Sequence, residues 1–152
     1  IETAIRSSTP SLKADPMEIV SGGITVAGAV DWIIAQKVRV PLLYSSADPE
    51  EVREAQSRLG RDRAGAVVEH FLAAVAVELR ARGFTRFLVA GGETSGAVVG
   101  ALGVPALLIG PEIDPGVPWT LSLGGAQPVA LALKSGNFGA SDFFLKAWDL
   151  LL

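Results

Sequence analysis

Two adjacent glycines and a run of oxygen-bearing side chains follow a short apolar stretch near the middle of the chain. The stretch RFLVA ends at Ala90 and is followed by GGETSG, which begins with Gly91, Gly92, Glu93 and Thr94. A strand that passes through glycines into a helix presents free backbone N–H groups and the positive end of the helix dipole to an anion. The glycines leave room for a phosphate, and the Glu and Thr side chains add oxygens beside it. The segment is therefore a candidate phosphate-binding loop.

This segment matches neither of the two familiar phosphate-binding motifs. Its glycine spacing agrees with the start of a P-loop, but Ala97 and Val98 stand where Lys and Ser or Thr are required. The dinucleotide pattern G-x-G-x-x-G fails because Glu93 takes its second glycine position. A nucleotide at this loop would need another mode of binding.

A structural interpretation of the same glycines stands beside the chemical one. Gly92, Gly96 and Gly100 are four residues apart, so on a helix they share one face and would let it pack closely against a sheet. Spacing alone favours packing. The two interpretations are compatible if Gly91 and Gly92 face the ligand and the later glycines pack.

A second glycine loop lies close to the end of the chain. The segment LKSGNFGASDFF places Gly136 and Gly139 between a predicted strand and a predicted helix, which repeats the arrangement of the first loop. Two such loops at strand ends would face one crevice, where Lys134 would bring a positive charge to a phosphate. The alternative for this segment alone is a glycine turn with a solvated Lys134.

Other residues with chemical potential have simpler structural explanations. His70, the only histidine, lies inside a predicted helix, where a surface position is expected rather than a catalytic one. Glu112 and Asp114 are candidate magnesium ligands, but exposure in a loop is favoured, and no metal ligand is assigned. Trp119 and Phe138 would suit a nucleotide base, although core packing is the common outcome for such residues.

The composition indicates one folded domain. The chain has 152 residues, of which 49% are hydrophobic and 19% charged, and its net charge is -3. It has no cysteine, which excludes disulfides and thiolate zinc sites, and no apolar run near the roughly 20 residues of a membrane span. The arginines from Arg53 to Arg63 alternate with acids and are expected to form exposed ion pairs. We expect a cytoplasmic protein that binds neither nucleic acid nor a membrane.

Local signals predict helices that alternate with strands. Helices are expected over 1–8, 16–37, 48–60, 61–83, 92–102 and 141–152, and strands over 38–46, 86–90, 105–110, 120–124 and 128–136. Three prolines in PEIDPGVPW predict a semi-rigid loop over 111–119. The expected fold is an α/β layered domain with a mixed β-sheet flanked by helices, ending in a hairpin and a C-terminal helix.

Four segments together resemble the C-terminal domain of the four-carbon acid sugar kinase family. They are YSSADPEEV, VAGGETSGAVVGALGV, IGPEIDPGVPW and ALKSGNFGASDFF, in this order, over about 42–144. Several long motifs in the same order as in the family are a specific sign of membership, whereas any one of them alone is not. The residues of the last two segments resemble those of the oxo-tetronate branch of the family more than those of the threonate and erythronate branches.

The resemblance implies an enzyme that uses ATP with Mg²⁺ to phosphorylate the terminal hydroxyl of a four-carbon sugar acid. For the oxo-tetronate branch the reaction is 3-oxo-tetronate to 3-oxo-tetronate 4-phosphate, and threonate or erythronate is the alternative substrate. Carried over residue by residue, the resemblance implies nucleotide contacts at Gly91, Gly92, Glu93, Thr94 and Gly136.

The resemblance also implies that residues 1–152 are one of two domains. In the family an N-terminal domain binds the sugar acid, so we expect it to hold the catalytic residues and to lie before Ile1, as would a serine-containing nucleotide loop. The chain starts without Met inside a predicted helix, which indicates a fragment that is inactive alone. Its apolar content is then partly an interface for the other domain, and a homodimer stays open. The alternative from another class is a non-enzymatic interaction module or effector that has kept the fold.

Overall fold

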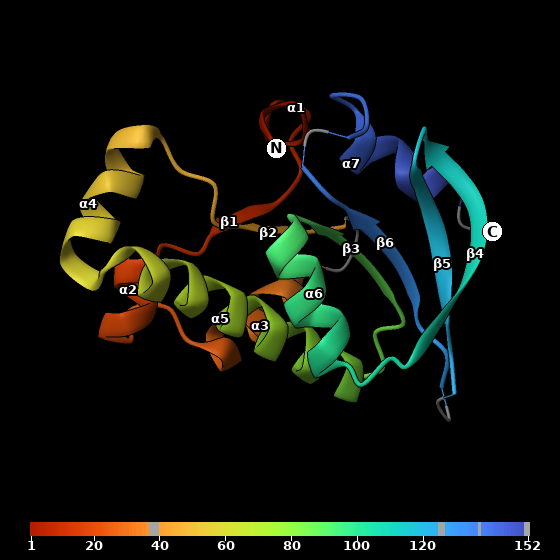
Figure 1. Cartoon of the computed structure of the whole chain (residues 1–152), viewed down its shortest axis with the longest axis horizontal. Coiled ribbons are helices and arrows are strands. Elements are labelled where there is room, and N and C mark those ends of the chain that lie inside the picture. The colour runs from red at the N-terminus through yellow and green to blue at the C-terminus, as the bar shows by residue number, and fades with distance from the viewer. Residues whose placement is uncertain (37–39, 125–126, 137, 151–152) are drawn as a thin grey trace.

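The computed structural model describes residues 1–36, 40–124, 127–136 and 138–150 (Figure 1). The helices in these ranges are α1 (Glu2–Arg6), α2 (Pro16–Ser21), α3 (Val26–Ala35), α4 (Pro49–Leu59), α5 (Arg61–Ala81), α6 (Gly92–Ala101), α7 (Phe143–Lys146) and the 3-10 helix η1 (Ala147–Leu150). The strands are β1 (Ser11–Lys13), β2 (Leu42–Tyr44), β3 (Arg86–Ala90), β4 (Ala106–Asp114), β5 (Val117–Leu123) and β6 (Ala130–Lys134).

The strands form two sheets that are not hydrogen-bonded to each other within the described residues. Strands β1 and β2 make a parallel pair, and the larger sheet has the order β3-β6-β5-β4. Strand β3 pairs with β6 in parallel, whereas β5 runs antiparallel to both β4 and β6. The predicted α/β class, the mixed sheet and the β5–β6 hairpin are confirmed, but the strands are divided between two sheets rather than joined in one.

Helices cover both faces of the larger sheet. In β6, Leu131 belongs to the core cluster built with α3, α5 and α6, whereas its neighbour Ala132 belongs to the cluster built with α7 and η1. Successive side chains of a strand point to opposite faces, so this alternation places the two sets of helices on opposite sides. The result is a three-layer arrangement with β6 at its centre.

The predicted helix over 16–37 is wrong as a single element. Helix α2 ends at Gly22, which has a left-handed backbone with φ of 78°, and α3 starts after Thr25, whose hydroxyl accepts a hydrogen bond from Gly28 N at 3.1 Å. A left-handed glycine and a new N-cap together stop one helix and begin another. Lys37 lies outside the described residues. The short strand β1, just before α2, was also missed.

The predicted proline loop over 111–119 is wrong as well. The segment consists of the end of β4, a tight turn and the start of β5, which pair from Ala106 to Asp114 with two irregularities in register. Strand β4 is an edge strand, where a proline such as Pro111 is tolerated because the missing N–H costs no hydrogen bond on the open side. Pro115 and Gly116, whose φ is 79°, have the residue order of a type II turn.

The remaining helices confirm the sequence predictions closely. Helix α4 begins with a capping box between Asp48 and Glu51, and Lys13 binds the Glu51 carboxylate at 2.8 Å. Helix α5 ends just before Gly83, which has a φ of 91°. The C-terminal helix is present as the short α7 followed by η1. In the part of the chain described here, no helix combines the length and the apolar character needed to cross a membrane.

Candidate nucleotide-binding site

The parallel pairing of β3 and β6 brings the two glycine loops together. Ala90 and Lys134 are paired at the carboxyl ends of the two strands, and the N–H of Gly91 donates to the carbonyl of Lys134 at 2.8 Å. One residue further, a Cβ on Gly92 would lie 3.4 Å from the Ser135 hydroxyl. The two loops therefore lie side by side at the carboxyl ends of their strands, the edge of the sheet where α/β proteins bind ligands.

The first glycine loop has an unusual backbone conformation and leads into a helix whose N-terminus has no side-chain cap among the described residues. Gly91 is the N-cap of α6 with a φ of 111°, a conformation that L side chains rarely adopt. Its carbonyl accepts from Ser95 N at 2.8 Å, which begins the helical ladder. No side chain caps α6, and the N–H groups of Gly92, Glu93 and Thr94 have no acceptor among the described residues. These three donors are available to an anion.

The second glycine loop carries a positive charge. The Lys134 ammonium donates to the carbonyl of Gly136 at 2.8 Å, so it lies over its own loop, and it forms no ion pair with a described carboxylate. Gly136 has a φ of 54°. Asn137 lies outside the described residues. Phe138 is 58% exposed, and the Cβ of a substituted Gly116 would lie 3.6 Å from its ring, so this ring remains at the surface near the β4–β5 turn.

Asp114 links the end of the second loop, at Ala140, to the β4–β5 hairpin. Asp114 is buried, with 9% of the residue exposed, and its carboxylate accepts hydrogen bonds from Ala140 N at 2.9 Å and from the Lys146 ammonium. The Lys146 hydrogen bond, followed by that of the Ala140 amide, holds the pKa of the Asp114 carboxyl below its usual value. This positioning role could not be predicted from local sequence, because Asp114 is separated from Ala140 and Lys146 by 26 and 32 residues.

The acids considered for magnesium have structural partners. Glu112 accepts from Gly116 N at 2.7 Å across the turn, and both Asp114 oxygens are hydrogen-bonded. Within the described ranges there is no group of three or more His, Cys, Asp or Glu side chains placed to hold a metal ion. The expectation that both acids are exposed in a loop is wrong for Asp114, which lies buried at the end of β4 because the Ala140 amide and the Lys146 ammonium bind its carboxylate.

The packing interpretation of the α6 glycines is wrong. A Cβ on Gly96 or Gly100 would meet no atom within 4 Å, so neither glycine allows a close approach. The buried face of α6 is formed instead by Ser95 and Val98. The Ser95 hydroxyl is buried and has no hydrogen-bond partner among the described residues. The glycine face is simply the exposed face of the helix.

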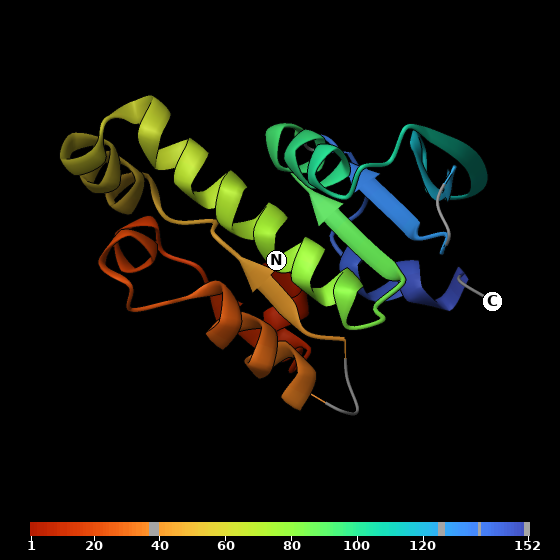
Figure 2. The same ribbon diagram turned by 90° about the horizontal axis from the view of Figure 1, so that it is seen from below.

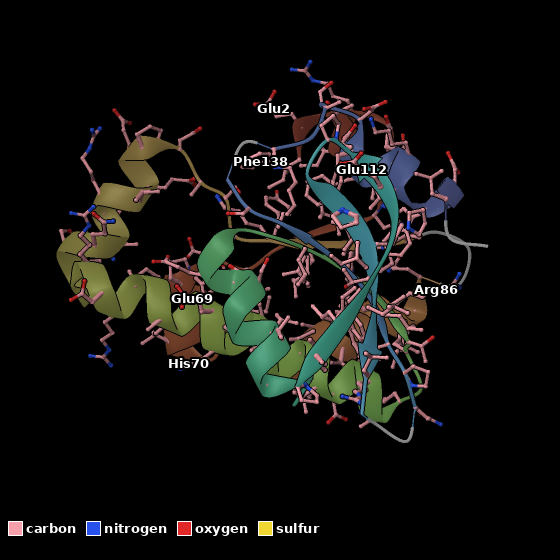
Figure 3. All side chains as sticks on the ribbon, turned by 45° about the vertical axis from the view of Figure 1, so that its right-hand side comes forward. Glu2, Glu69, His70, Arg86, Glu112 and Phe138 are labelled. Carbon is pink, nitrogen blue, oxygen red and sulfur yellow. The ribbon has the colours of Figure 1, made fainter. Side chains whose placement is uncertain are left out.

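His70, Trp119 and the arginines on α4 lie where their structural interpretations placed them, whereas core packing is wrong for Phe138, which is exposed. His70 is exposed on α5, and Figure 3 shows it with Glu69 far from Phe138 and Glu112. Trp119 is buried, donates to the carbonyl of Ala147 at 2.8 Å and contacts a second tryptophan, so it belongs to the core. On α4, the two arginines of the predicted cluster form exposed ion pairs with neighbouring glutamates.

A cavity of about 800 Å³ opens beside the first glycine loop. Thr94 lines it, as do three residues at the carboxyl end of β2, namely Tyr44, Ser45 and Ser46. These three residues were not predicted as site residues, although a hydroxyl-rich turn directly after a predicted strand indicates a ligand site in an α/β protein. They add hydroxyl groups on the side of the cavity opposite the first loop.

This arrangement is suited to binding a phosphorylated ligand. It combines the open N-terminus of α6, two glycine loops that let a ligand approach the backbone, and one lysine that has no carboxylate partner among the described residues. Helix N-termini and successive backbone N–H groups stabilise phosphate oxygens, and an ammonium adds a point charge. The fold and the site therefore define an α/β domain with a candidate phosphate-binding edge.

The chain belongs to the family of nucleotide-binding C-terminal domains, whose model matches residues 1–144. It is 50% identical over 147 residues to a 3-oxo-tetronate kinase of Pseudomonas fluorescens, a match that covers 97% of this chain and 34% of the relative. A 3-oxo-tetronate kinase of Burkholderia multivorans is also 50% identical, over 95% of this chain and 33% of the relative. The chain thus spans about a third of the length of these curated relatives.

Among solved structures, a Haemophilus influenzae protein of the DUF1537 family superposes with a TM-score of 0.91 at 35% identity. The match covers 99% of this chain and 36% of that protein. The likeness therefore extends over the whole described fold, and it again involves about a third of a longer protein.

Proposed function

We propose that this chain is the C-terminal nucleotide-binding domain of a longer kinase that phosphorylates a four-carbon sugar acid with ATP. The proposed reaction converts 3-oxo-tetronate to 3-oxo-tetronate 4-phosphate. The observation that carries the proposal is the junction of the two glycine loops at the Gly91–Lys134 hydrogen bond, beside the open start of α6. The names of the curated relatives support the sugar acid as the substrate class.

In this proposal the two loops hold the phosphates of ATP. The N–H groups of Gly92, Glu93 and Thr94 donate to phosphate oxygens, Gly136 lets the second loop approach them, and Lys134 leaves its own loop to neutralise charge. Phosphoryl transfer depends chiefly on such positioning and charge neutralisation. Magnesium would be bound mainly through the phosphates and water, because the oxygens of Asp114 are already engaged by Ala140 and Lys146.

The acceptor and the catalytic base are assigned to the part of the longer protein that this chain does not contain. We therefore expect the isolated domain to lack kinase activity, since half of the reacting geometry is missing. The full-length kinase is expected to act in the cytoplasm on a soluble metabolite, either as a monomer or as a homodimer.

The test uses the full-length protein with ATP and Mg²⁺ against a panel of four-carbon acids that includes 3-oxo-tetronate, threonate and erythronate. We expect phosphorylation of 3-oxo-tetronate and saturable ATP binding by calorimetry. Gly92→Val is expected to weaken ATP binding, because the new side chain approaches Ser135 and shields the helix start. Gly100→Val, on the same exposed face, is the matched control.

Two outcomes would contradict different parts of the proposal. If millimolar ATP gives no binding to the folded protein, the nucleotide site is wrong. If ATP binds but no four-carbon acid is phosphorylated, the substrate class is wrong. Phosphorylation of threonate or erythronate but not of 3-oxo-tetronate would show that the protein is a threonate or erythronate kinase of the same family.

A further inference from the structure

The cavity of about 800 Å³ lies between strand β2 and strand β3. Residues of β2 line one side and residues of β3 the other, and the two strands point the same way (Figure 2). Paired strands lie about 4.8 Å apart, which leaves no space of this size between them. We call this cavity between β2 and β3 the slot. We propose that one further parallel β-strand, formed by the residues directly before Ile1 in the longer protein, occupies it.

The backbone of β3 has one edge free toward the slot. The carbonyl of Thr85 and the N–H of Gly91 are both bonded to the neighbouring strand β6. In a parallel ladder, alternate residues bond to one neighbour, so the odd-numbered residues of β3 pair with β6. The N–H and C=O groups of Arg86, Leu88 and Ala90 therefore point the other way, toward β2.

The backbone of β2 offers a matching edge. The N–H of Leu42 and the carbonyl of Tyr44 are bonded to residues that flank and continue β1. The same alternation directs the backbone groups of Leu43 and Ser45 toward the slot. Among the described residues no backbone hydrogen bond is recorded for these groups. Two open edges thus face each other across the cavity, and one inserted strand would pair with both.

The walls of the slot are suited to a strand that is buried on both faces. Helix α5 contributes Leu72, Val75 and Leu79 on one side, and the C-terminal helices contribute Phe144 and Trp148 on the other. Strands in the interior of a parallel sheet are covered on both faces and are apolar along their whole length. The occupant is therefore expected to be about five mainly apolar residues, matching the length of β3.

The connectivity of the chain indicates the source of this strand. Ile1 itself lines the slot, and α1 leads from it to β1, which is parallel to β2. A strand that enters α1 and continues into β1 would complete a parallel crossover unit of the common kind. This inference rests on the proposal that the chain is part of a longer kinase, whose curated relatives have about two thirds of their length outside the match.

The inserted strand would join the two sheets into one, in the order β1-β2-inserted strand-β3-β6-β5-β4. It would also end beside Ser45, Ser46 and Thr94, at the edge where the nucleotide is proposed to bind. The division of the sheet in this chain then reflects a missing central strand.

Hydrogen exchange of the full-length protein tests this inference without reference to kinase activity. We expect the amides of Leu43, Ser45, Leu88 and Ala90 to exchange more than about tenfold more slowly than unstructured amides, because each is bonded to the inserted strand. The amide of Phe87, bonded to β6, is the internal reference. Rapid exchange of the four amides beside a protected Phe87 would overturn the inference. Protection that appears only in a dimer would overturn it too, by assigning the strand to a second copy.

A pair of proline variants provides a second readout in the full-length protein. Ser45→Pro removes an N–H that is expected to bond the inserted strand, so a lower Tm is expected. Ser46→Pro, one residue further, where the same alternation directs the backbone N–H away from the slot, is the control and should have the smaller effect. Equal changes in the Tm would count against a bonded Ser45. If the full-length protein phosphorylates no sugar acid but shows these exchange and Tm patterns, the inserted strand is supported and only the proposed function is wrong.

Discussion

The N–H of Gly91 donates to the carbonyl of Lys134 at 2.8 Å, across 43 residues of sequence, and so ties the first glycine loop to the second. The bond follows directly from the parallel pairing of Ala90 with Lys134. It places the open start of α6 beside the backbone of Lys134, where the second glycine loop begins.

Gly91→Ala is expected to destabilise the domain by about 1–3 kcal/mol, because Ala must adopt the φ of 111° that Gly91 has. For a domain of this size each kcal/mol lowers the Tm by about 2–4 °C. Gly96→Ala is the matched control, since its Cβ would meet no atom within 4 Å and Ala favours a helix by about 0.5–1 kcal/mol. Thermal unfolding of both variants checks the prediction, and a Gly91→Ala protein as stable as wild type would contradict it.

Lys134→Met is expected to raise the Kd for ATP about tenfold or more without lowering the Tm appreciably. The ammonium forms one hydrogen bond with its own loop and no ion pair with a described carboxylate, so its charge is available to phosphate. Calorimetric titration at two salt concentrations measures the loss, which should shrink at higher salt. Arg63→Met, an exposed change on α5, is the control. Equal Kd values for both variants would exclude Lys134 from the phosphate site.

Asp114→Asn is expected to lower the Tm at pH 7 and to lose this effect in acid. The folded-state pKa of Asp114 lies below its ordinary value, chiefly because of the Lys146 hydrogen bond. The carboxylate therefore stabilises the fold fully above the unfolded pKa of about 3.9, and this contribution disappears as the pH falls through the lowered folded pKa.

Tm measurements from pH 7 to pH 2.5 check this linkage, with Glu2→Gln in the exposed Arg6 pair as the control. A constant Tm difference between wild type and Asp114→Asn over the whole range would show that the carboxylate charge is not what stabilises the loop.

Ser95→Ala is expected to leave stability unchanged or to raise it by up to about 1–3 kcal/mol. The Ser95 hydroxyl is buried in the first turn of α6 and has no partner among the described residues, which is a costly state for a polar group. Chemical denaturation measures the change. A clear loss of stability would reveal a hydrogen bond to a buried water, and a loss of ATP affinity alone would assign the hydroxyl to the ligand.

Local signals in the sequence were sufficient for much of the fold and for the first glycine loop. The caps at Asp48 and Gly83 and the apolar period of α5 depend on residues within one or two turns, so helix boundaries could be predicted from them. The same holds for Gly91, whose position after an apolar strand predicts a strand-to-helix turn. Its role in nucleotide binding stays a prediction.

Where local signals compete, the secondary structure predicted from sequence alone was wrong. The pattern over 16–37 keeps its apolar period through Gly22, and only the left-handed backbone there shows that two helices are present. Pro111 argues against a strand unless that strand lies at the edge of a sheet, and edge position is a property of the assembled sheet.

What the sequence by itself determined was the set of parts: two glycine loops, a lysine beside the second of them, capped helices and an α/β pattern. Only the tertiary structure decided that β3 lies beside β6, that Asp114 holds the second loop through Ala140, and that a slot separates β2 from β3. The physical reason is that caps and periodicity act over a few residues, whereas strand order and buried ion pairs are chosen by the packing of the whole chain.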